Sequence, residues 1–217
     1  MKLSYIKASN ETLLSPSSSA WGKVESHAVD LFQTPIAMVA HLSPFMALSE
    51  THGRINKLNF KMAHNEKTAN IYVTWQDETR DDKIEDLDQF IDSVAIMFPL
   101  TPTAQSMTMG DADNPVNMWF WRADQKDPYD VIAHGFGTSE RRSGALHGLS
   151  VFSEYRNGHW HVVFQRNMRS NIIGHKQVAF KPKDISGLAF AIWDGSNKER
   201  SAQKSFSGNW LAFEVDA

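Results

Sequence analysis

Residues 106–111 and 114–121 read Ser106-Met107-Thr108-Met109-Gly110-Asp111 and Asn114-Pro115-Val116-Asn117-Met118-Trp119-Phe120-Trp121. Gly110 and Pro115 predict an irregular turn, and the alternating run that follows predicts a β-strand entering an aromatic core. Val116, Met118 and Phe120 share one face of this strand, and Asn117, Trp119 and Trp121 share the other. Met109 places a thioether sulfur on the turn, where it can act as an axial haem ligand or as core filler against aromatic rings.

Six further apolar runs predict strands on both sides of this segment. They lie at residues 57–62, 71–75, 93–98, 160–166, 188–193 and 209–215. The sequence has few long helical periodicities and no internal repeat. We therefore predict a mainly β protein, an antiparallel β-sandwich with long loops and a few short helices.

The predicted sandwich occupies residues 21–217 as a single domain, and residues 1–20 form a polar lead-in, with order beginning near Trp21. A chain of 217 residues is long enough to bury about 70 % of its unfolded surface. The runs at 34–39 and 43–48 open with prolines, which favours edge strands or loops. The acidic run at 77–92 is typical of a solvated loop or short helix, and its spacing does not match an EF-hand calcium loop.

The composition excludes several classes of protein. The chain contains no cysteine, which rules out disulfides, cysteine-held iron–sulfur clusters and the covalent attachment of a c-type haem. Its net charge of −3 is spread over interspersed signs, unlike the basic face that nucleic-acid binding requires. Neither a G-x-S-x-G elbow nor an H-E-x-x-H helix is present, so an independent hydrolase is not indicated.

Two groups of polar residues have both an ordinary and a functional interpretation. His159 and His161 lie on the outer face of a predicted strand, and His52 and His64 flank another, so haem or zinc ligation by these histidines is not favoured. Residues 193–205 form a polar excursion between two apolar strands and carry two lysines and an arginine. Such a segment is by default a solvated loop.

Several motifs together resemble the haem b (γ) subunits of the ethylbenzene dehydrogenase group of molybdenum enzymes, which includes dimethyl sulfide dehydrogenase, selenate reductase and chlorate reductase. The motifs are Thr34-Pro35, Ser43-Pro44-Phe45, residues 92–99, Met109-Gly110-Asp111, residues 115–119, 160–163 and 190–195, and the segment from Glu199-Arg200 to Lys204-Ser205. The resemblance spans residue 21 to the end of the chain. Residues 34–53 look nearest to the hydroxylating branch, which contains ethylbenzene dehydrogenase and the steroid C25 dehydrogenases.

The resemblance implies one non-covalent haem b, held between two loops at one end of the sandwich, with Met109 and Lys204 as axial ligands. Met97, Met107 and Lys198 are alternative ligands. Met109 is preferred because it precedes a glycine on a loop, whereas Met97 lies in an apolar strand and is expected in the core. A lysine amine must be neutral to bind iron, and burial and the metal charge both lower its pKa.

With both axial positions occupied, the haem would relay electrons rather than bind substrate. In the group that the chain resembles, the α subunit carries the molybdenum cofactor and an iron–sulfur cluster, and the β subunit carries further clusters. The γ subunit passes electrons to a soluble acceptor such as a cytochrome c. The resemblance thus implies a heterotrimer that hydroxylates an alkylbenzene or a steroid side chain with water.

Three further expectations concern location, charge neutralisation and the alternative function. Residues 1–8 lack the apolar core of a signal peptide, and no apolar run is long enough to span a membrane. We therefore expect the chain to reach the periplasm docked to a partner that carries a signal.

Four arginines could neutralise the haem propionates, although solvent exposure is the ordinary expectation for each: Arg141, Arg142, Arg166 and Arg200. The alternative function is a haem-free carbohydrate- or ligand-binding β-sandwich module, which would also be rich in tryptophan.

Overall fold

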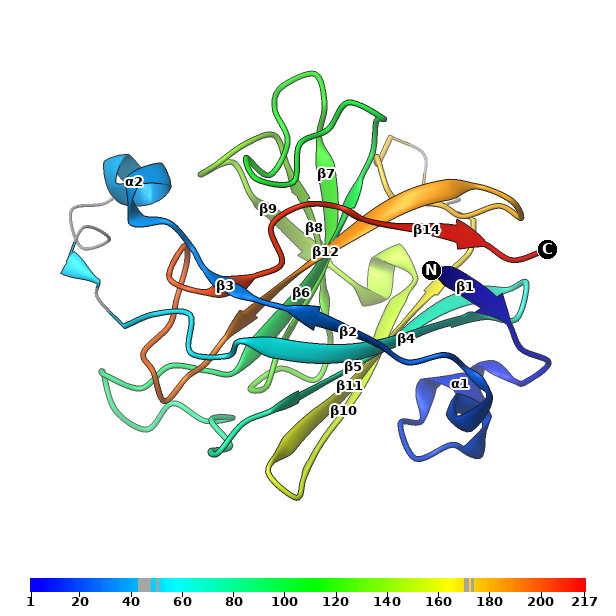
Figure 1. The fold of residues 1–217 in the computed structure, drawn as a ribbon, viewed down its shortest axis with the longest axis horizontal. Coiled ribbons are helices and arrows are strands. Elements are labelled where there is room, and N and C mark those ends of the chain that lie inside the picture. The colour runs from blue at the N-terminus through cyan, green and yellow to red at the C-terminus, as the bar shows by residue number, and fades with distance from the viewer. Residues whose placement is uncertain (43–47, 50, 170–171, 173) are drawn as a thin grey trace.

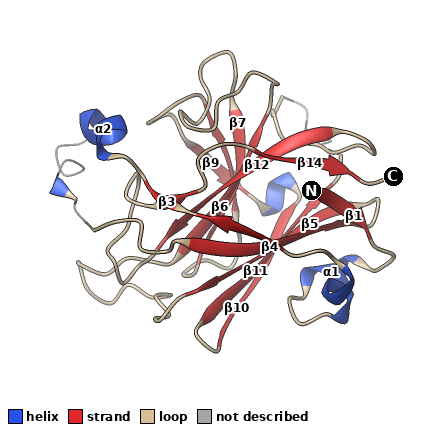
Figure 2. Ribbon diagram, viewed as in Figure 1, coloured by secondary structure: helices blue, strands red, loops and turns tan. Residues whose placement is uncertain are grey.

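The computed structural model describes residues 1–42, 48–49, 51–169, 172 and 174–217. β-Strands dominate the described chain, with a few short helices (Figures 1 and 2). The strands are β1 (Lys2–Tyr5), β2 (His27–Asp30), β3 (Phe32–Gln33), β4 (Lys57–His64), β5 (Thr68–Gln76), β6 (Ser93–Pro99), β7 (Val116–Arg122), β8 (Tyr129–Ala133), β9 (Glu140–Ser143), β10 (Leu149–Arg156), β11 (His159–Asn167), β12 (Ile185–Trp193), β13 (Ser205–Phe206) and β14 (Leu211–Val215). The helices are α1 (Asn10–Leu14) and α2 (Ile36–Val39), with 3₁₀ turns at Ser19–Lys23, Ala40–Leu42 and Ala145–His147. The predicted mainly β class is confirmed.

The strands pair in the order β10-β11-β5-β4-β1-β14-β12-β6-β7-β8-β9. Every pairing along this path is antiparallel except those of β1, which runs parallel to both β14 and β4. Strand β1 therefore joins two antiparallel halves, one ending in β10 and the other in β9. The sheet is mixed at this single junction and antiparallel elsewhere on the path.

The main core lies between these two halves, where aromatic side chains from opposite layers meet. The rings of Phe60 on β4 and Phe190 on β12 are 4.8 Å apart, and those of Trp75 and Trp121 are 6.3 Å apart. Residues Val94, Ile96 and Phe98 of β6 are buried in the same cluster. Burial of these large apolar groups between the layers provides the main driving force for folding.

The outer face of the β12-β6-β7-β8 half is apolar as well. Met118 and Phe120 of β7 point away from the core and form a second cluster with Ala95 of β6 and Val131 of β8. The predicted alternation along β7 is confirmed, because Trp119 and Trp121 lie in the core cluster and Met118 and Phe120 in the outer one. An apolar sheet face outside the core must be covered by another layer or a ligand.

The first twenty residues belong to the fold, so the prediction that order begins near Trp21 is wrong. Strand β1 completes the sheet between β14 and β4, and its Leu3 is buried. Helix α1 is capped by Ser9, whose hydroxyl accepts from the Thr12 backbone N–H, and it buries Leu13. Leu3 and Leu13 help to dock the segment, because each is buried in a larger core cluster.

Two other segments differ from or extend the predictions. Residues 36–39 form helix α2 rather than the predicted edge strand or loop. Residues 43–47 and Glu50 of the other proline-opened run lie outside the described residues. The acidic run between β5 and β6 is a loop, as predicted, but Asp77 and Asp92 at its two ends are buried. In the described part of the chain, no helix has the length and apolar character needed to cross a membrane.

Candidate functional site

A cavity of about 1210 Å³ lies over the outer face of β12, β6, β7 and β8. Met97, Met118, Phe120 and Ala191 form part of its floor, and four loops supply its walls. These wall loops are residues 84–91, 106–109, 136–141 and the segment from Glu199 to Gly208. The volume exceeds the roughly 300–1,000 Å³ of most small-molecule sites. The loops with Met109 and Lys204 border this cavity, while its floor is a sheet face that the sequence did not indicate.

The turn between β6 and β7 places Met109 at the cavity. Met109 has a φ of 59° and Gly110 a φ of 79°, and a Cβ at position 110 would lie 2.5 Å from the Asn114 carbonyl oxygen. The positive φ of residue 110 and the lack of space for a Cβ there together require glycine at this position. The Met109 N–H donates to the Ser106 carbonyl at 3.1 Å, and its own carbonyl accepts from Gly135 N–H at 3.0 Å. The turn is therefore fixed on both sides, and Met109 lines the cavity.

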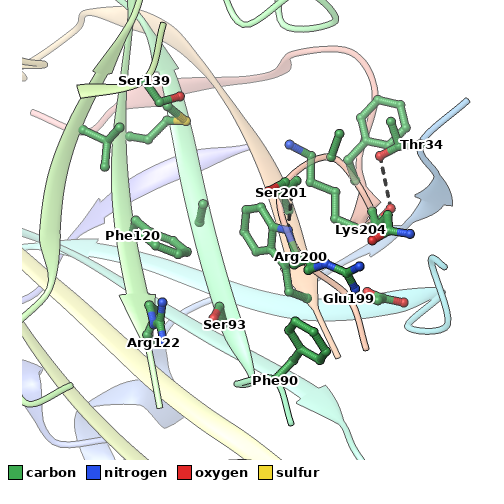
Figure 3. A pocket seen from close by; sticks show the side chains of 18 of the residues that line it. Thr34, Phe90, Ser93, Phe120, Arg122, Ser139, Glu199, Arg200, Ser201 and Lys204 are labelled. Atoms are coloured by element: carbon green, nitrogen blue, oxygen red, sulfur yellow. Dashed lines mark hydrogen bonds between the residues drawn. The ribbon is translucent and has the colours of Figure 1, made fainter. Parts of the chain in front are cut away.

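Lys204 reaches the same cavity from the segment before β13 (Figure 3). Its carbonyl accepts from the Thr34 N–H at 3.2 Å and the Thr34 hydroxyl at 3.1 Å. Its Nζ lies 5.1 Å from the centroid of the Trp193 ring and makes no hydrogen bond or ion pair with any residue that the structure describes. Burial lowers the pKa of the Lys204 amine to about 8. Although the residue keeps partial surface where it faces the cavity, its amine is easily converted to the neutral, metal-binding form.

The segment that carries Lys204 is held in place by Glu199. This carboxylate is buried, accepts from the backbone N–H groups of Gly53 (2.7 Å) and Arg54 (3.0 Å), and also accepts from Asp194 N–H at 3.1 Å. The Trp193 indole N–H donates to the Ser201 carbonyl at 2.9 Å. The segment is thus an ordered wall rather than the solvated loop that its polar composition suggests by default.

The alternative candidate ligands differ in whether they line the cavity. Met107 and Met97 line the cavity, as do Met38 and Met118, which were not among the predicted ligands. Met97 is half-buried on the outer face, so its expected place in the core is wrong. Lys198 does not line the cavity, and its amine forms an ion pair with Asp88 at 2.9 Å. The described residues that line the cavity include no histidine.

Arg141 and Arg200 line the cavity with their guanidinium groups stacked on aromatic rings. Arg141 lies 5.1 Å above the Phe120 ring, and Arg200 lies 4.6 Å above the Phe90 ring. Neither forms an ion pair with a carboxylate among the described residues. Both remain available for an anionic group at the cavity.

The other two arginines lie away from the cavity. Arg166 is buried at 1 % exposure, and its guanidinium contacts Asp130 at 3.0 Å. Arg142 contacts the other oxygen of the same carboxylate at 2.7 Å. The ordinary expectation of solvent exposure is therefore wrong for Arg166 and Arg142, because a buried aspartate on β8 pairs with both.

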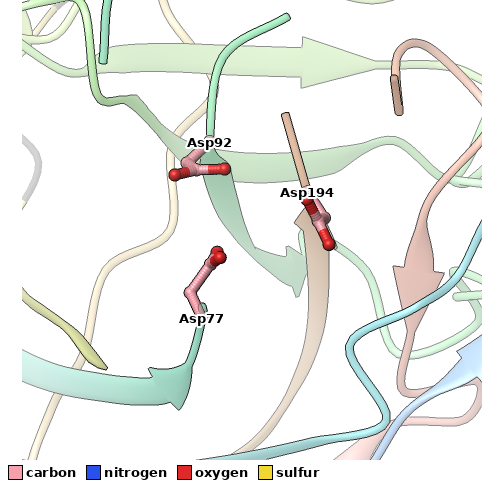
Figure 4. A group of neighbouring side chains, drawn as sticks. All are labelled: Asp77, Asp92 and Asp194. Carbon is pink, nitrogen blue, oxygen red and sulfur yellow. The ribbon is translucent and has the colours of Figure 1, made fainter. Parts of the chain in front are cut away.

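Three buried aspartates meet where the two halves of the fold approach each other (Figure 4). Asp77 follows β5, Asp92 precedes β6 and Asp194 follows β12, and one carboxylate oxygen of each lies within 4.8 Å of the others. Burial raises the pKa of Asp77 to about 6 and that of Asp92 to about 7. Asp92 accepts from the Trp160 indole (2.9 Å) and from Gly195 N–H (2.9 Å). The cluster therefore anchors the acidic loop and the Lys204 segment to the core.

A sequence model of the family described as ethylbenzene dehydrogenase matches residues 18–154 and 148–205. The chain belongs to this family. The match includes both Met109 and Lys204, and it covers most of the chain from the end of the lead-in to the start of β13.

Three relatives align with nearly the whole chain. A protein of Haloferax mediterranei named as a respiratory nitrate reductase haem subunit is 32 % identical over 91 % of this chain and 67 % of its own length. The chlorate reductase subunit gamma of Ideonella dechloratans is 30 % identical over 90 % and 77 %. The dimethylsulfide dehydrogenase subunit gamma of Rhodovulum sulfidophilum is 30 % identical over 95 % and 76 %. The predicted resemblance to this group of γ subunits is confirmed, whereas its hydroxylating branch stays a prediction.

The fold is shared with proteins of distant sequence. A family 9 carbohydrate-binding module from Caldicellulosiruptor kristjanssonii in complex with glucose superposes with a TM-score of 0.52 at 10 % identity. The superposition covers 100 % of this chain and 95 % of that chain. At this level of identity the likeness describes the β-sandwich architecture alone.

Proposed function

We propose that this chain is the electron-transfer subunit of a molybdenum and iron–sulfur oxidoreductase and that it holds one haem b between Met109 and Lys204. The observation that carries the proposal is the Lys204 amine, which has a lowered pKa and lies without a hydrogen-bonding partner among the described residues in the cavity that Met109 also lines. Membership of the ethylbenzene dehydrogenase family supports the same function.

The residues of the cavity fit a non-covalent haem. The floor is a largely apolar sheet face, and a neutral amine and a thioether are both donors that iron accepts. When bound, the haem supplies one-electron redox chemistry. Arg141 and Arg200, which lack carboxylate partners among the described residues, would neutralise its propionates. The thioether of Met109 would favour the ferrous state, and with Met109 and Lys204 both held by the iron the haem would relay electrons rather than bind substrate.

The proposal also covers the partner subunits, the electron acceptor and the substrate of the complex. The names of the chlorate reductase and dimethylsulfide dehydrogenase relatives contain "subunit gamma", which supports assembly of this chain with an α and a β subunit. We assign the molybdenum cofactor and iron–sulfur clusters to those partners and the final acceptor to a soluble protein such as a cytochrome c. The resemblance of residues 34–53 to the hydroxylating branch supports an alkylbenzene or steroid side chain as substrate and the periplasm as location.

A haem-free carbohydrate-binding module is the alternative. Such a module would display tryptophans as an exposed platform. All seven tryptophans of the chain lie in the described part, and none is exposed. Five of them are buried to 3 % or less, and Trp193 and Trp210 are half-buried beside the cavity and the outer cluster. The tryptophans of this fold therefore form no exposed platform.

The test is the visible spectrum of the chain co-expressed with its partners and supplied with haem. We expect a low-spin haem spectrum whose α band sharpens on reduction with dithionite. Met109→Ala and Lys204→Ala should each lose it or convert it to a five-coordinate form. The matched controls are Met107→Ala and Lys198→Ala, which remove the same side chains nearby and should keep the wild-type spectrum.

Each outcome of this experiment has one meaning. A colourless wild-type complex overturns the proposed function and leaves the binding module as the function to test. Loss of the low-spin spectrum in Met107→Ala or Lys198→Ala, with retention in the Met109 or Lys204 variant, shows that the ligand assignment is wrong. The haem itself is then retained and the ligand pair is revised.

A further inference from the structure

The loop between β5 and β6 concentrates the negative charge of the chain. Residues 78–90, here called the acidic rim, contain six carboxylates and two cations, a net charge of −4, whereas the whole chain has −3. The carboxylates are Glu78, Asp81, Asp82, Glu85, Asp86 and Asp88, and the cations are Arg80 and Lys83. The remainder of the chain is therefore close to neutral, and the acidic rim is its dominant electrostatic feature.

Pairing inside the protein neutralises only part of this charge. Arg80 pairs with Asp82 at 2.7 Å, and Lys198 pairs with Asp88 at 2.9 Å. Glu85 and Asp86 form no ion pair with any cation in the described part of the chain. Their negative charge is directed at solvent, where it acts on approaching molecules.

The acidic rim also forms one wall of the cavity. Ile84, Leu87 and Phe90 line it together with Glu85 and Asp86. Leu87 is 99 % exposed and Ile84 is 55 % exposed. Two exposed aliphatic side chains beside the unpaired carboxylates of Glu85 and Asp86 resemble small transient interfaces, in which apolar contacts are bordered by polar groups.

The acidic rim is attached to the segment that carries Lys204. The Arg200 guanidinium lies 4.6 Å above the Phe90 ring, and the Lys198 amine binds Asp88. At the base of the loop, Asp92 accepts from both Asp81 N–H (2.8 Å) and Gly195 N–H (2.9 Å). A molecule that binds the acidic rim therefore contacts a wall built on the same segment as the proposed iron ligand.

We propose that the acidic rim docks a redox protein with a basic surface around its own electron-transfer centre, and that the electron leaves the cavity on this side. This inference rests on the proposed function, because the cavity must hold the haem. One electron passes from the ferrous haem of this chain to the oxidised centre of the partner, which is reduced, and no bond or proton is exchanged. Charge complementarity speeds the encounter without requiring a large or tight interface.

The test compares two electron acceptors of opposite charge in stopped-flow oxidation of the reduced, haem-loaded complex. The probes are a basic mitochondrial-type cytochrome c and ferricyanide. Glu85→Gln/Asp86→Asn removes two charges with little change of size, and Leu87→Ser removes the apolar tip. The control is Glu25→Gln/Asp30→Asn, which removes two exposed charges on and beside β2, away from the residues that line the cavity.

At low ionic strength we expect Glu85→Gln/Asp86→Asn to slow the reaction with basic cytochrome c by about fivefold or more. The dependence of the rate on salt should become shallower, because fewer charges attract the partner. The rate with ferricyanide should stay unchanged or rise. Leu87→Ser should slow only the cytochrome reaction, and the β2 variant should behave as wild type.

Three results would overturn the inference. Equal cytochrome rates in wild type and both rim variants, with a normal haem spectrum, show that docking occurs elsewhere while the proposed function stands. An equal effect of the β2 variant shows that only total charge matters. Loss of the co-purified iron–sulfur subunit from the rim variants shows that the acidic rim contacts that subunit instead. A complex that contains no haem would overturn the proposed function itself.

Discussion

The two faces of the β12-β6-β7-β8 half belong to the same strands but are covered differently. On the inner face, Trp119 and Trp121 pack against aromatic rings from the opposite layer and are buried to 1 % or less. On the outer face, Met118 and Phe120 line the cavity and contact no second sheet among the described residues. The inner face is satisfied by the protein alone, whereas the outer face is completed by loops and by what the cavity holds. The proposed function uses this outer face, which loops rather than a second sheet enclose in the described part of the chain.

The largest effect should come from emptying the inner face. Trp119→Ala removes a fully buried indole and should lower the free energy of unfolding by about 3–5 kcal/mol, since the surrounding core cannot collapse into the space. Phe120→Ala, its neighbour on the outer face, should cost less than half as much because its ring borders the cavity. Urea denaturation of both haem-free variants measures the difference. Equal losses would show that the outer cluster is packed as tightly as the core.

A second effect should come from the buried ion pair between Asp130 of β8 and Arg166 of β11, which joins the two halves of the fold. Asp130→Ala leaves the buried guanidinium of Arg166 uncompensated and should cost about 3 kcal/mol or more. Asp30→Ala breaks an exposed pair with Lys57 and should change the free energy of unfolding by less than about 1 kcal/mol. Similar values for the two variants would mean that Asp130 contributes no more than a surface charge.

The aspartate cluster should give the stability a distinctive dependence on pH. The pKa values of Asp77 and Asp92 are raised to about 6 and about 7 in the folded chain, mainly by burial. The native state therefore binds more protons than the unfolded state between about pH 4 and pH 7, and this contribution to the free energy of unfolding is lost as pH rises through that window. Asp77→Asn should make the fall shallower, and Asp30→Asn should not. A slope unaltered by Asp77→Asn would contradict the raised pKa values.

The smallest effect should come from a methionine on the cavity floor. Met97→Leu conserves volume and should change the free energy of unfolding by less than about 1.5 kcal/mol. The haem spectrum should also be retained, because the proposed ligand is Met109. Loss of the low-spin spectrum in Met97→Leu, with normal unfolding, would move the ligand from the turn to the strand.

The amount that could be predicted differs between strands and sites. The strand at residues 116–122 and the division of its side chains between two faces follow from a local alternation, and the structure confirms both. The cavity could not be predicted, because periodicity indicates that a face is apolar but not what covers it. Arg166 shows the same limit, since its burial depends on Asp130, which lies 36 residues away in sequence.

The sequence by itself determined seven of the described strands, the exclusion of thiol chemistry and the family of the chain, because these depend on residue types and short-range patterns. Tertiary structure alone decided that Met109 and Lys204 face one cavity, that Lys198 does not, and that three aspartates meet at one junction. Burial and long-range pairing created these features, including the lowered pKa of the Lys204 amine. Both arise only when segments distant in sequence remove each other from water.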